Sequence, residues 1–450
     1  MSVYLRTITL AASPFALVPG AKLRDPEGSS RFWHQVAEGL EASNKGRVHV
    51  VADHAGAKNE QGHYATLSED SLEHPPQLFT ITDDGDQPDL VLPEGCVLQS
   101  IEMRVHDHHT SIIELLIDVT EYLGRRRLSA TDVVGLETLA HELGAQACAG
   151  FGQRWIGRLD QLLEASDADE EFVSSTDEPG LELLWTSRAL FTDRDTEARL
   201  RLAEVWLRDA NDDPSAVPEL VAGQRDHVVS WLNYLFLDDA VEAAATLRPD
   251  RPARDVWAGL RYAQYFYASL EQVDNRLADV LAQTHATLRG AELAELREEL
   301  TDAAHAADLI VMERQRTEKY LRRSVRRHMQ AVLSGWDTDE LVEQPVRHKA
   351  ALCTQRVAAI EGDLARQAGV WTDLILLGIA VTSILGTALA VVSFGRAIGS
   401  DSGMAGYDSG SSGLIEWLAS QPADNVLITS LVISAGLGFI YVLYRRSSQS

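Results

Sequence analysis

The chain has 450 residues, 45% of them hydrophobic, and a net charge of −27 from 67 acidic and 40 basic side chains. This length exceeds one compact core and predicts several structural units, and the hydrophobic content excludes a largely disordered protein. A surface this acidic repels the phosphate backbone of nucleic acids, so we expect no nucleic-acid partner.

Residues 1–165 and 166–250 are expected to form a mixed α/β domain. Short β-type runs separated by Pro- and Gly-rich turns occur at residues 4–11, 47–52, 78–82, 97–105, 112–119, 181–191 and 227–237. Residues 131–163 have the pattern of one amphipathic helix, and the acidic stretch 167–179 is a candidate linker. Strands mixed with helices predict a sheet covered by helices. We prefer a first strand to a signal peptide because Pro14 interrupts the apolar start.

The sequence His106-Asp107-His108-His109 stands where a turn between two strands is expected. Alternate residues of an extended chain point the same way, so His106 and His108 are candidate ligands of one metal ion. The alternative interpretation is a polar turn without a metal.

A second polar turn contains Asp83-Asp84-Gly85-Asp86 and Asp89, whose oxygens suit a divalent cation such as Mg²⁺ or Ca²⁺. It lacks the later glutamate of an EF-hand, and a solvated loop is the alternative. The sequence contains no glycine-rich phosphate loop, no nucleophile elbow and no Cys–His zinc pattern. We therefore expect no enzyme and no cofactor beyond a divalent cation.

Residues 251–370 are predicted to form a stalk of long helices. Residues 255–288 place apolar side chains at three- and four-residue steps, as in a helix with one buried stripe. A basic block follows: Arg314, Arg316, Lys319, Arg322, Arg323, Arg326 and Arg327. We call five of these residues the basic patch: Arg316, Arg322, Arg323, Arg326 and Arg327. It is either a solvated helix face paired with acidic neighbours, or a surface for lipid headgroups or a phosphate-bearing ligand.

A heptad seam begins after Pro345. Its apolar members are Val346, Ala350, Cys353, Val357, Ile360, Leu364 and Trp371. This spacing predicts a coiled-coil face, either between subunits, which we prefer, or against helices of the same chain. One helix over residues 346–394 would be about 73 Å long, at 1.5 Å per residue. The cysteines Cys96, Cys148 and Cys353 show no paired spacing, which indicates buried, reduced thiols.

Residues 371–450 are predicted to form a hairpin of two transmembrane helices. Residues 374–394 and 426–444 lack charged side chains, and about 20 such residues cross a bilayer as a helix. Arg366 precedes the first run and Arg445 and Arg446 follow the second, whereas the intervening loop is acidic. The excess of basic residues at the flanks predicts a multi-pass protein of the cell membrane with both termini in the cytoplasm.

The first apolar run carries small and hydroxyl side chains at helical spacing. Its candidate pore or packing face comprises Gly378, Thr382, Ser383, Gly386, Thr387 and Ala390. Small residues four apart let helices approach closely, and Ser383 and Thr387 would give a conduction path a hydroxyl lining. Neither run holds an ionisable side chain, which argues against a proton relay or a charge-coupled carrier.

The order of a soluble domain, long helices and a two-span hairpin resembles the CorA-type magnesium channel superfamily. That family carries Gly-Met-Asn after its first span, and Gly403-Met404-Ala405 is the nearest match here, with Ala405 in place of Asn and a longer loop. The resemblance implies a pentamer, a pore lined by the first span and gating by divalent cations bound to acidic cytoplasmic surfaces.

The first functional hypothesis is a homo-oligomeric CorA-like membrane protein whose cytoplasmic domain senses a small ligand or protein partner and gates an ion pathway. Cations are the expected permeant, because the loop between the spans is acidic. The second hypothesis is a membrane-anchored sensor or effector of a microbial stress or defence system, whose hairpin anchors in or permeabilises the bilayer. A pure anchor that never conducts is the third.

Overall fold

The structure is a computed structural model of the whole chain, which divides into an N-terminal unit, Met1–Val357, and a C-terminal unit, Ala358–Ser450. It describes residues 3–17, 48–52, 77–83, 90–106, 108–124, 130–164, 173–175, 180–192, 227–229, 232–237, 251–284 and 291–400, with single positions or short runs between 31 and 42, 206 and 222, and 417 and 436.

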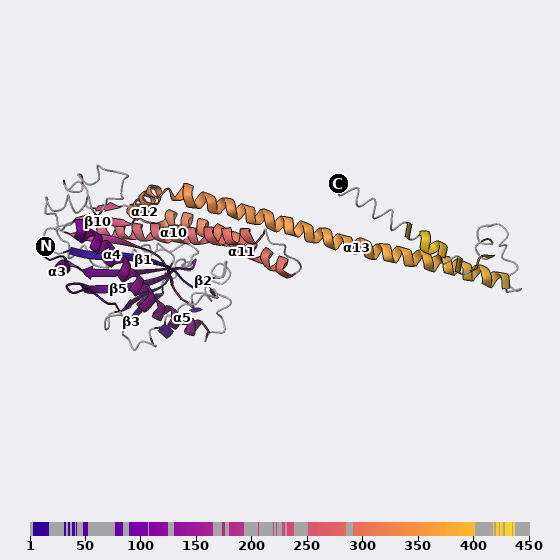
Figure 1. The fold of residues 1–450 in the computed structure, drawn as a ribbon, viewed down its shortest axis with the longest axis horizontal. Coiled ribbons are helices and arrows are strands. Elements are labelled where there is room, and N and C mark those ends of the chain that lie inside the picture. The colour runs from indigo at the N-terminus through magenta and orange to yellow at the C-terminus, as the bar shows by residue number, and fades with distance from the viewer. Residues whose placement is uncertain are drawn as a thin grey trace, which may run out of the picture. The chain divides into compact units, whose positions relative to one another are not determined.

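In the described residues, the N-terminal unit is built on an eight-stranded sheet with the order β3-β4-β5-β6-β1-β8-β10-β9 (Figure 1). Neighbouring strands are antiparallel except β8 and β10, which run parallel. A separate pair joins β2 to β7. The strands are β1 Val3–Ala12, β2 Phe15–Leu17, β3 Val48–Ala52, β4 Gln77–Asp83, β5 Val97–His106, β6 Thr110–Asp118, β7 Val173–Ser175, β8 Glu182–Thr192, β9 His227–Val229 and β10 Asn233–Leu237.

The predicted α/β class is confirmed for this unit, because the sheet is covered by helices and followed by a helical region. The first six predicted β-type runs each coincide with a strand. The prediction of one run over 227–237 is wrong, because β9 and β10 are two strands paired antiparallel, with Tyr234 opposite Val229. No Gly or Pro stands between residues 229 and 233 to mark that break in the sequence.

One face of the sheet packs against helix α4 (Ala130–Ala147) and helix α5 (Gln153–Glu164). A π-helical turn, η1 (Cys148–Gly152), joins them, so the predicted helix over 131–163 is continuous but contains a π segment. Gly144 of α4 lies so close to the sheet that a Cβ there would be 2.4 Å from Thr186 Oγ1. Apolar side chains from alternate positions of the central strands and from both helices form the main core.

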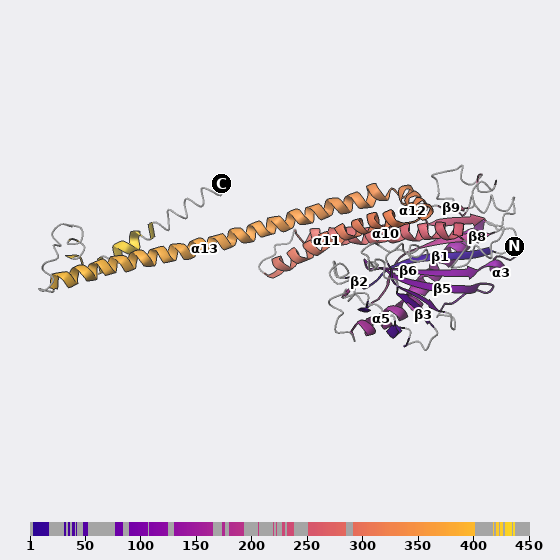
Figure 2. The same cartoon turned by 180° about the vertical axis from the view of Figure 1, so that it is seen from behind.

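The other face packs against α10 (Arg251–Gln283). Figure 2 shows this helix between the sheet and α12 (Arg323–Gly335), and α11 (Ala291–Tyr320) packs beside it. Gly259 permits a close approach of α10 and α12, because a Cβ there would be 2.7 Å from His328 Cβ and 3.0 Å from the backbone nitrogen of Met329. Residues 255–266 of α10 are therefore all buried.

A second π-helical turn, η2 (Asp339–Glu343), leads into α13 (Gln344–Ser400), which has 57 residues. The prediction of one long helix over 346–394 is confirmed. The first seam residues, Val346, Ala350 and Cys353, are buried within the chain itself. All three cysteines are free and buried, as expected. Across the residues that the structure describes, no helix reaches the length and apolar character that crossing a membrane requires.

Candidate functional site

The sheet face that meets α10 buries a charged cluster. Glu114 of β6 is fully buried, and its carboxylate accepts a hydrogen bond from Arg6 Nη2 of β1 at 2.6 Å. From α10, Arg261 Nε donates to the same carboxylate at 2.6 Å and Trp257 Nε1 at 2.8 Å. The guanidinium of Arg6 also lies over the Trp257 ring, 3.8 Å from its centroid, as in a cation–π contact. One carboxylate thus joins two neighbouring strands to one helix.

A second carboxylate lies directly opposite the first. Glu102 of β5 is the cross-strand partner of Glu114, and like charges at such positions repel each other. Arg104 offsets this repulsion, because its Nη2 pairs with Glu102 and its Nε lies 3.4 Å from a Glu114 oxygen. We call these five residues the Glu114 cluster: Arg6, Glu102, Arg104, Glu114 and Arg261.

The cluster shifts the pKa values of its members. Burial raises the pKa of Glu114, but the charges of Arg261, Arg6 and Arg104 outweigh burial and hold that pKa well below its usual value. Burial lowers the pKa of Arg6 to about 10, with the charge of Glu114 acting against it. Both groups are therefore ionised at neutral pH. Directional bonds among fixed charges set the position of α10 on the sheet, because any slippage would leave a buried charge unpaired.

Polar contacts continue along α10 beyond the cluster. Gln264 accepts a hydrogen bond from Ser187 Oγ of β8 at 2.7 Å and donates one to the Tyr234 hydroxyl of β10 at 3.0 Å. Further along the helix, Ser269 Oγ lies 3.0 Å from Thr110 Oγ1 of β6. Each of these side chains is buried. The interface between sheet and helix is therefore held by specific polar pairs along much of its length.

The candidate metal ligands lie at the tip of the β5–β6 hairpin and have different partners. The buried ring of His106 packs on Tyr265 of α10, with centroids 4.9 Å apart. His108 Nε2 lies 2.6 Å from Glu313 Oε2 of α11. Among the described residues, no group of three or more His, Cys, Asp or Glu side chains could hold a metal ion. Asp107 lies outside the described residues, so the shared ion stays a prediction.

The same hairpin tip has an unusual backbone. His108 and His109 both have a φ of 54°, a left-handed conformation that side chains other than glycine seldom adopt. Thr110 Oγ1 donates to the carbonyl of His108 at 3.1 Å, and His109 Nδ1 lies 3.1 Å from the carbonyl of Ser13. Such conformations cost about 1–3 kcal/mol each and persist where the surroundings enforce them. Positive φ values are common in tight hairpin loops, and contacts with Ser13 and with Glu313 of α11 hold this tip in place.

A further ion-pair centre joins α11 to the start of the stalk helix. Arg314 of α11 is buried and contacts three carboxylates: Glu318 at 3.2 Å, Asp339 at 2.7 Å and Glu343 at 2.5 Å. Burial lowers the pKa of Arg314, but the hydrogen bond to Asp339 and the three negative charges outweigh it and raise that pKa. Asp339 and Glu343 are the first and last residues of η2, so one guanidinium ties both ends of the π-helical turn.

Two members of the predicted basic patch contact groups of the same chain. Arg322 Nη1 lies 4.0 Å from Asp255 of α10, and Arg326 Nη1 donates to the backbone carbonyl of Glu318 at 3.2 Å. The remaining members, Arg316, Arg323 and Arg327, have exposed side chains. An acidic partner as in the paired-face interpretation is shown for Arg322, and binding of lipid headgroups or of a phosphate-bearing ligand by the patch stays a prediction.

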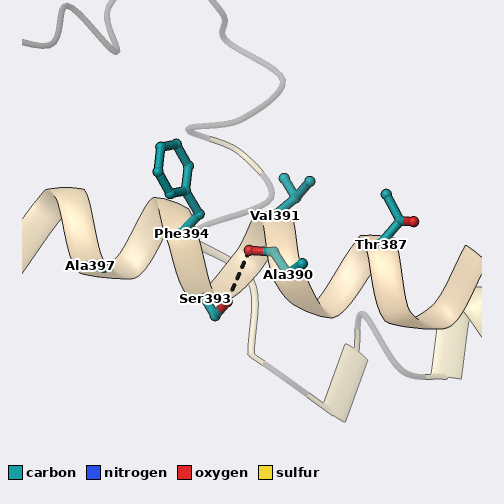
Figure 3. Close-up of a pocket in the computed structure, with 6 residues that line it drawn as sticks. All are labelled: Thr387, Ala390, Val391, Ser393, Phe394 and Ala397. Carbon is teal, nitrogen blue, oxygen red and sulfur yellow. Dashed lines mark hydrogen bonds between the residues drawn. The ribbon is translucent and has the colours of Figure 1, made fainter.

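The candidate pore or packing face lies on α13. Its hydroxyls bind their own helix: Thr382 Oγ1 donates to the carbonyl of Gly378 at 2.9 Å and Thr387 Oγ1 to that of Ser383 at 2.8 Å. An open groove of about 710 Å³ follows this helix in the C-terminal unit (Figure 3). It is lined by Thr387, Ala390, Val391, Ser393, Phe394 and Ala397.

Two predicted motifs fall outside the described residues. The loop motif Gly403-Met404 is one, and the acidic turn from Asp84 to Asp89 is the other. Sequence reasoning, in turn, missed the Glu114 cluster. Its signal was present, because Glu102 and Arg104 stand at alternate positions of one predicted strand and Glu114 interrupts the next. Alternating charges ordinarily indicate a solvent-facing strand face.

Comparisons with known proteins do not assign the chain to a family. No family model matches it, and the searches of curated proteins and of solved structures return no match.

Proposed function

We propose that the chain is a two-span membrane protein of CorA-like layout that forms a homo-oligomer and gates a cation pathway. In this proposal the N-terminal unit is a cytoplasmic sensing domain, and the joint between its sheet and helices controls α13. The lipid bilayer and further copies of the chain are the partners, and a small ligand or protein would act on the sensing domain.

The observation that carries the proposal is the apolar surface of α13. Large apolar side chains are exposed along it: Ile375, Leu376, Ile379, Ile384, Leu389 and Phe394. At 100° per residue, Ile375 and Ile384 lie on opposite sides of the helix. A helix that is apolar on all sides is buried in a large core or a membrane, and exposure of this kind in water is strongly unfavourable.

The sequence extends this surface. Leu374, Ala388 and Val392 belong to the same charge-free run of 21 residues, and their side chains lie outside the described ones. In the second run, Ile428, Leu431, Val432 and Ile433 are also exposed. Two charge-free runs of 21 and 19 residues in the sequence favour a hairpin, and a single hairpin encloses no path, which favours an oligomer.

A cation is the favoured permeant. The loop between the runs contains Asp401, Asp408, Glu416 and Asp424 against Arg396 alone, and acidic rings concentrate cations at a pore mouth. Small residues at helical spacing would let neighbouring copies approach closely around the path.

Ion flux into proteoliposomes tests the proposal. Purified full-length protein is reconstituted and the uptake of Mg²⁺, Na⁺ and K⁺ is followed with and without internal divalent cations. Gly386→Leu would fill the small face and should abolish flux, whereas Gly369→Leu, on the same helix outside the charge-free run, should preserve it. A flux no greater than that of empty vesicles under every condition would contradict the gated pathway.

The sensor or effector hypothesis is retained as the second candidate because of one observation. Ala405 stands where the resembled family has an Asn, whose carboxamide helps that family hold a hydrated cation. Without it, a hairpin that permeabilises the membrane when triggered is the competing function. Growth arrest with membrane depolarisation on induced expression would favour this hypothesis over regulated transport.

A further inference from the structure

The junction that precedes α13 carries three marks of a strained segment. Asp337 has a φ of 47°, in the left-handed region. The next residue, Thr338, is fully buried, and its hydroxyl has no hydrogen-bond partner among the described residues. Residues Asp339–Glu343 then form the π-helical turn η2. Native structures seldom combine an unfavourable backbone, an unsatisfied buried hydroxyl and a π turn unless the segment does a specific task.

A π turn differs from an α turn by one residue. It packs an extra residue into the helix without advancing the residues that follow. If η2 relaxes to α-helical geometry, that extra residue joins the α ladder, and every later residue rotates by about 100° and advances by about 1.5 Å relative to the residues before the turn. The turn therefore separates two discrete registers of the same helix.

One buried side chain holds the π register. Arg314 contacts Asp339 at 2.7 Å and Glu343 at 2.5 Å, the two ends of η2, from a position on α11 that is itself buried; the Glu343 side chain is largely buried, whereas that of Asp339 is exposed. A planar guanidinium suits this task because it presents several donors in a fixed geometry. Arg347 also reaches Glu343, at 2.8 Å, but from an exposed position on α13. Exposed pairs of that kind contribute little.

The junction is also connected to the sheet. Trp336, just before it, packs edge-on against Tyr267 of α10, with ring centroids 5.5 Å apart. Tyr267 packs in the same way against Trp185 of β8, at 5.9 Å. On α11, Glu313 contacts the hairpin tip at His108 while the adjacent Arg314 contacts η2. Two short series of side-chain contacts therefore connect the sheet to η2, one through Tyr267 and one through Glu313 and Arg314.

We propose that η2 is a register latch for α13, closed by Arg314 and opened when the extra residue of the π turn joins the α-helix. In the closed state, Val346, Ala350 and Cys353 face inward and are buried. In the open state these three residues turn by about 100° around the helix axis. Other side chains of α13 then face α10. This inference concerns the N-terminal unit alone, so it stands whether or not α13 enters a membrane.

Cys353 reports the register directly, because its thiol is fully buried in the closed state. The full-length protein is treated with a maleimide, and the labelling rate of each cysteine is measured by peptide mass spectrometry. We expect Arg314→Ala to raise the Cys353 rate by about tenfold or more, since it removes the largely buried pair of Arg314 with Glu343, and loss of such a pair shifts the opening equilibrium strongly. The rates of Cys96 and Cys148, which are buried in the main core that the sheet forms with α4 and α5, should stay unchanged.

Two variants separate a latch from a merely structural contact. Arg347→Ala removes a bond to the same carboxylate and should leave the Cys353 rate within about twofold of wild type, because that pair is exposed. Deletion of Leu341, an exposed residue of η2, removes the extra residue and with it the second register. In the Arg314→Ala background this deletion should return the Cys353 rate to the wild-type value, whereas a simple loss of packing would not be repaired.

Unchanged labelling of Cys353 in Arg314→Ala overturns the latch, as does a rate that stays high after deletion of Leu341. If Arg314→Ala exposes all three cysteines, the variant has unfolded, and Arg314→Lys takes its place, since lysine keeps the charge but does not bridge both ends of η2. A Cys353 rate in Arg314→Lys equal to that of wild type would then reject the proposal.

Discussion

Glu313 and Arg314 are neighbours on α11, and their side chains bind different parts of the N-terminal unit. The carboxylate of Glu313 lies 2.6 Å from His108 at the tip of the β5–β6 hairpin, whereas Arg314 binds both ends of η2, next to the start of α13. One turn of α11 therefore contacts both the β5–β6 hairpin of the sheet and the turn η2 that leads into α13. Through these contacts and the Glu114 cluster, α10 and α11 connect the sheet to the start of α13.

The Glu114 cluster should dominate the stability of the sheet–helix interface. Glu114→Gln removes the charge that pairs with Arg6 and Arg261 and leaves Glu102, the partner of Arg104, as the remaining carboxylate among three buried arginines. We expect a loss of about 3–5 kcal/mol in the free energy of unfolding, measured by urea denaturation, as for other broken buried ion pairs. Glu121→Gln, at an exposed position of α3 (Thr120–Leu123), is the control and should change it by less than about 0.5 kcal/mol. Equal effects of the two substitutions would contradict this assignment.

The same carboxylate should make stability depend on acid pH. The pKa of Glu114 in the folded protein lies well below the value of about 4.3 for an unfolded chain. Its contribution is therefore complete above that unfolded pKa and is lost as the pH falls toward the folded pKa. Urea midpoints measured in steps below about pH 4.3 should fall more steeply for wild type than for Glu114→Gln. Parallel curves would show that Glu114 is not the linked group.

Two helical glycines should respond to alanine with opposite signs. A Cβ at Gly259 would meet backbone atoms of α12 at 3.0 and 3.1 Å, which cannot move aside as a flexible side chain can. Gly259→Ala should therefore cost about 1–3 kcal/mol of stability through overpacking. Gly157 of α5 has open space around its Cβ position, so Gly157→Ala should gain up to about 1 kcal/mol from helix propensity. Thermal denaturation of both variants measures this contrast, and a shift of the same sign in both would refute it.

The contact between His108 and Glu313 should be energetically coupled. A double-mutant cycle with His108→Asn and Glu313→Gln removes the pair while keeping a residue that tolerates a positive φ at position 108. We expect a coupling energy of about 1 kcal/mol, since both side chains are largely buried at this contact. Additive effects in the cycle would mean that the hairpin tip and α11 are merely adjacent.

The strands and the long stalk helix were predictable because each depends on a local pattern. Short β-type runs between Pro- and Gly-rich turns located six strands, and the heptad seam that begins at Val346 located the start of α13. The Glu114 cluster was not predictable, because Arg261 lies 147 residues from Glu114 along the chain. The sequence does not indicate which helix covers which face of the sheet. Charges at alternate positions such as Glu102 and Arg104 ordinarily indicate a solvent-facing strand face, and the packing of α10 buries that face.

The junction at η2 was equally hidden. A π turn leaves no distinct signature, since Asp339–Glu343 has the sequence of an ordinary helix, and Arg314 looked like one member of a basic block. The role of Arg314 follows from its three acidic partners, two of which, Asp339 and Glu343, come after α12 in the sequence. The shared metal at His106 and His108, the pore face and the loop motif stay predictions for experiment.

The central claim, that residues 374–394 and 426–444 hold the protein in a bilayer, is tested most directly by alkaline extraction of membranes from cells that express the full chain. We expect the wild-type protein and Gln355→Arg, at an exposed position of α13 before the apolar run, to remain in the membrane pellet. Ile384→Arg, at the centre of that run, should partly release the protein, because a charge there costs about 2.5–3.5 kcal/mol. Complete release of the wild-type protein into the supernatant would contradict the claim.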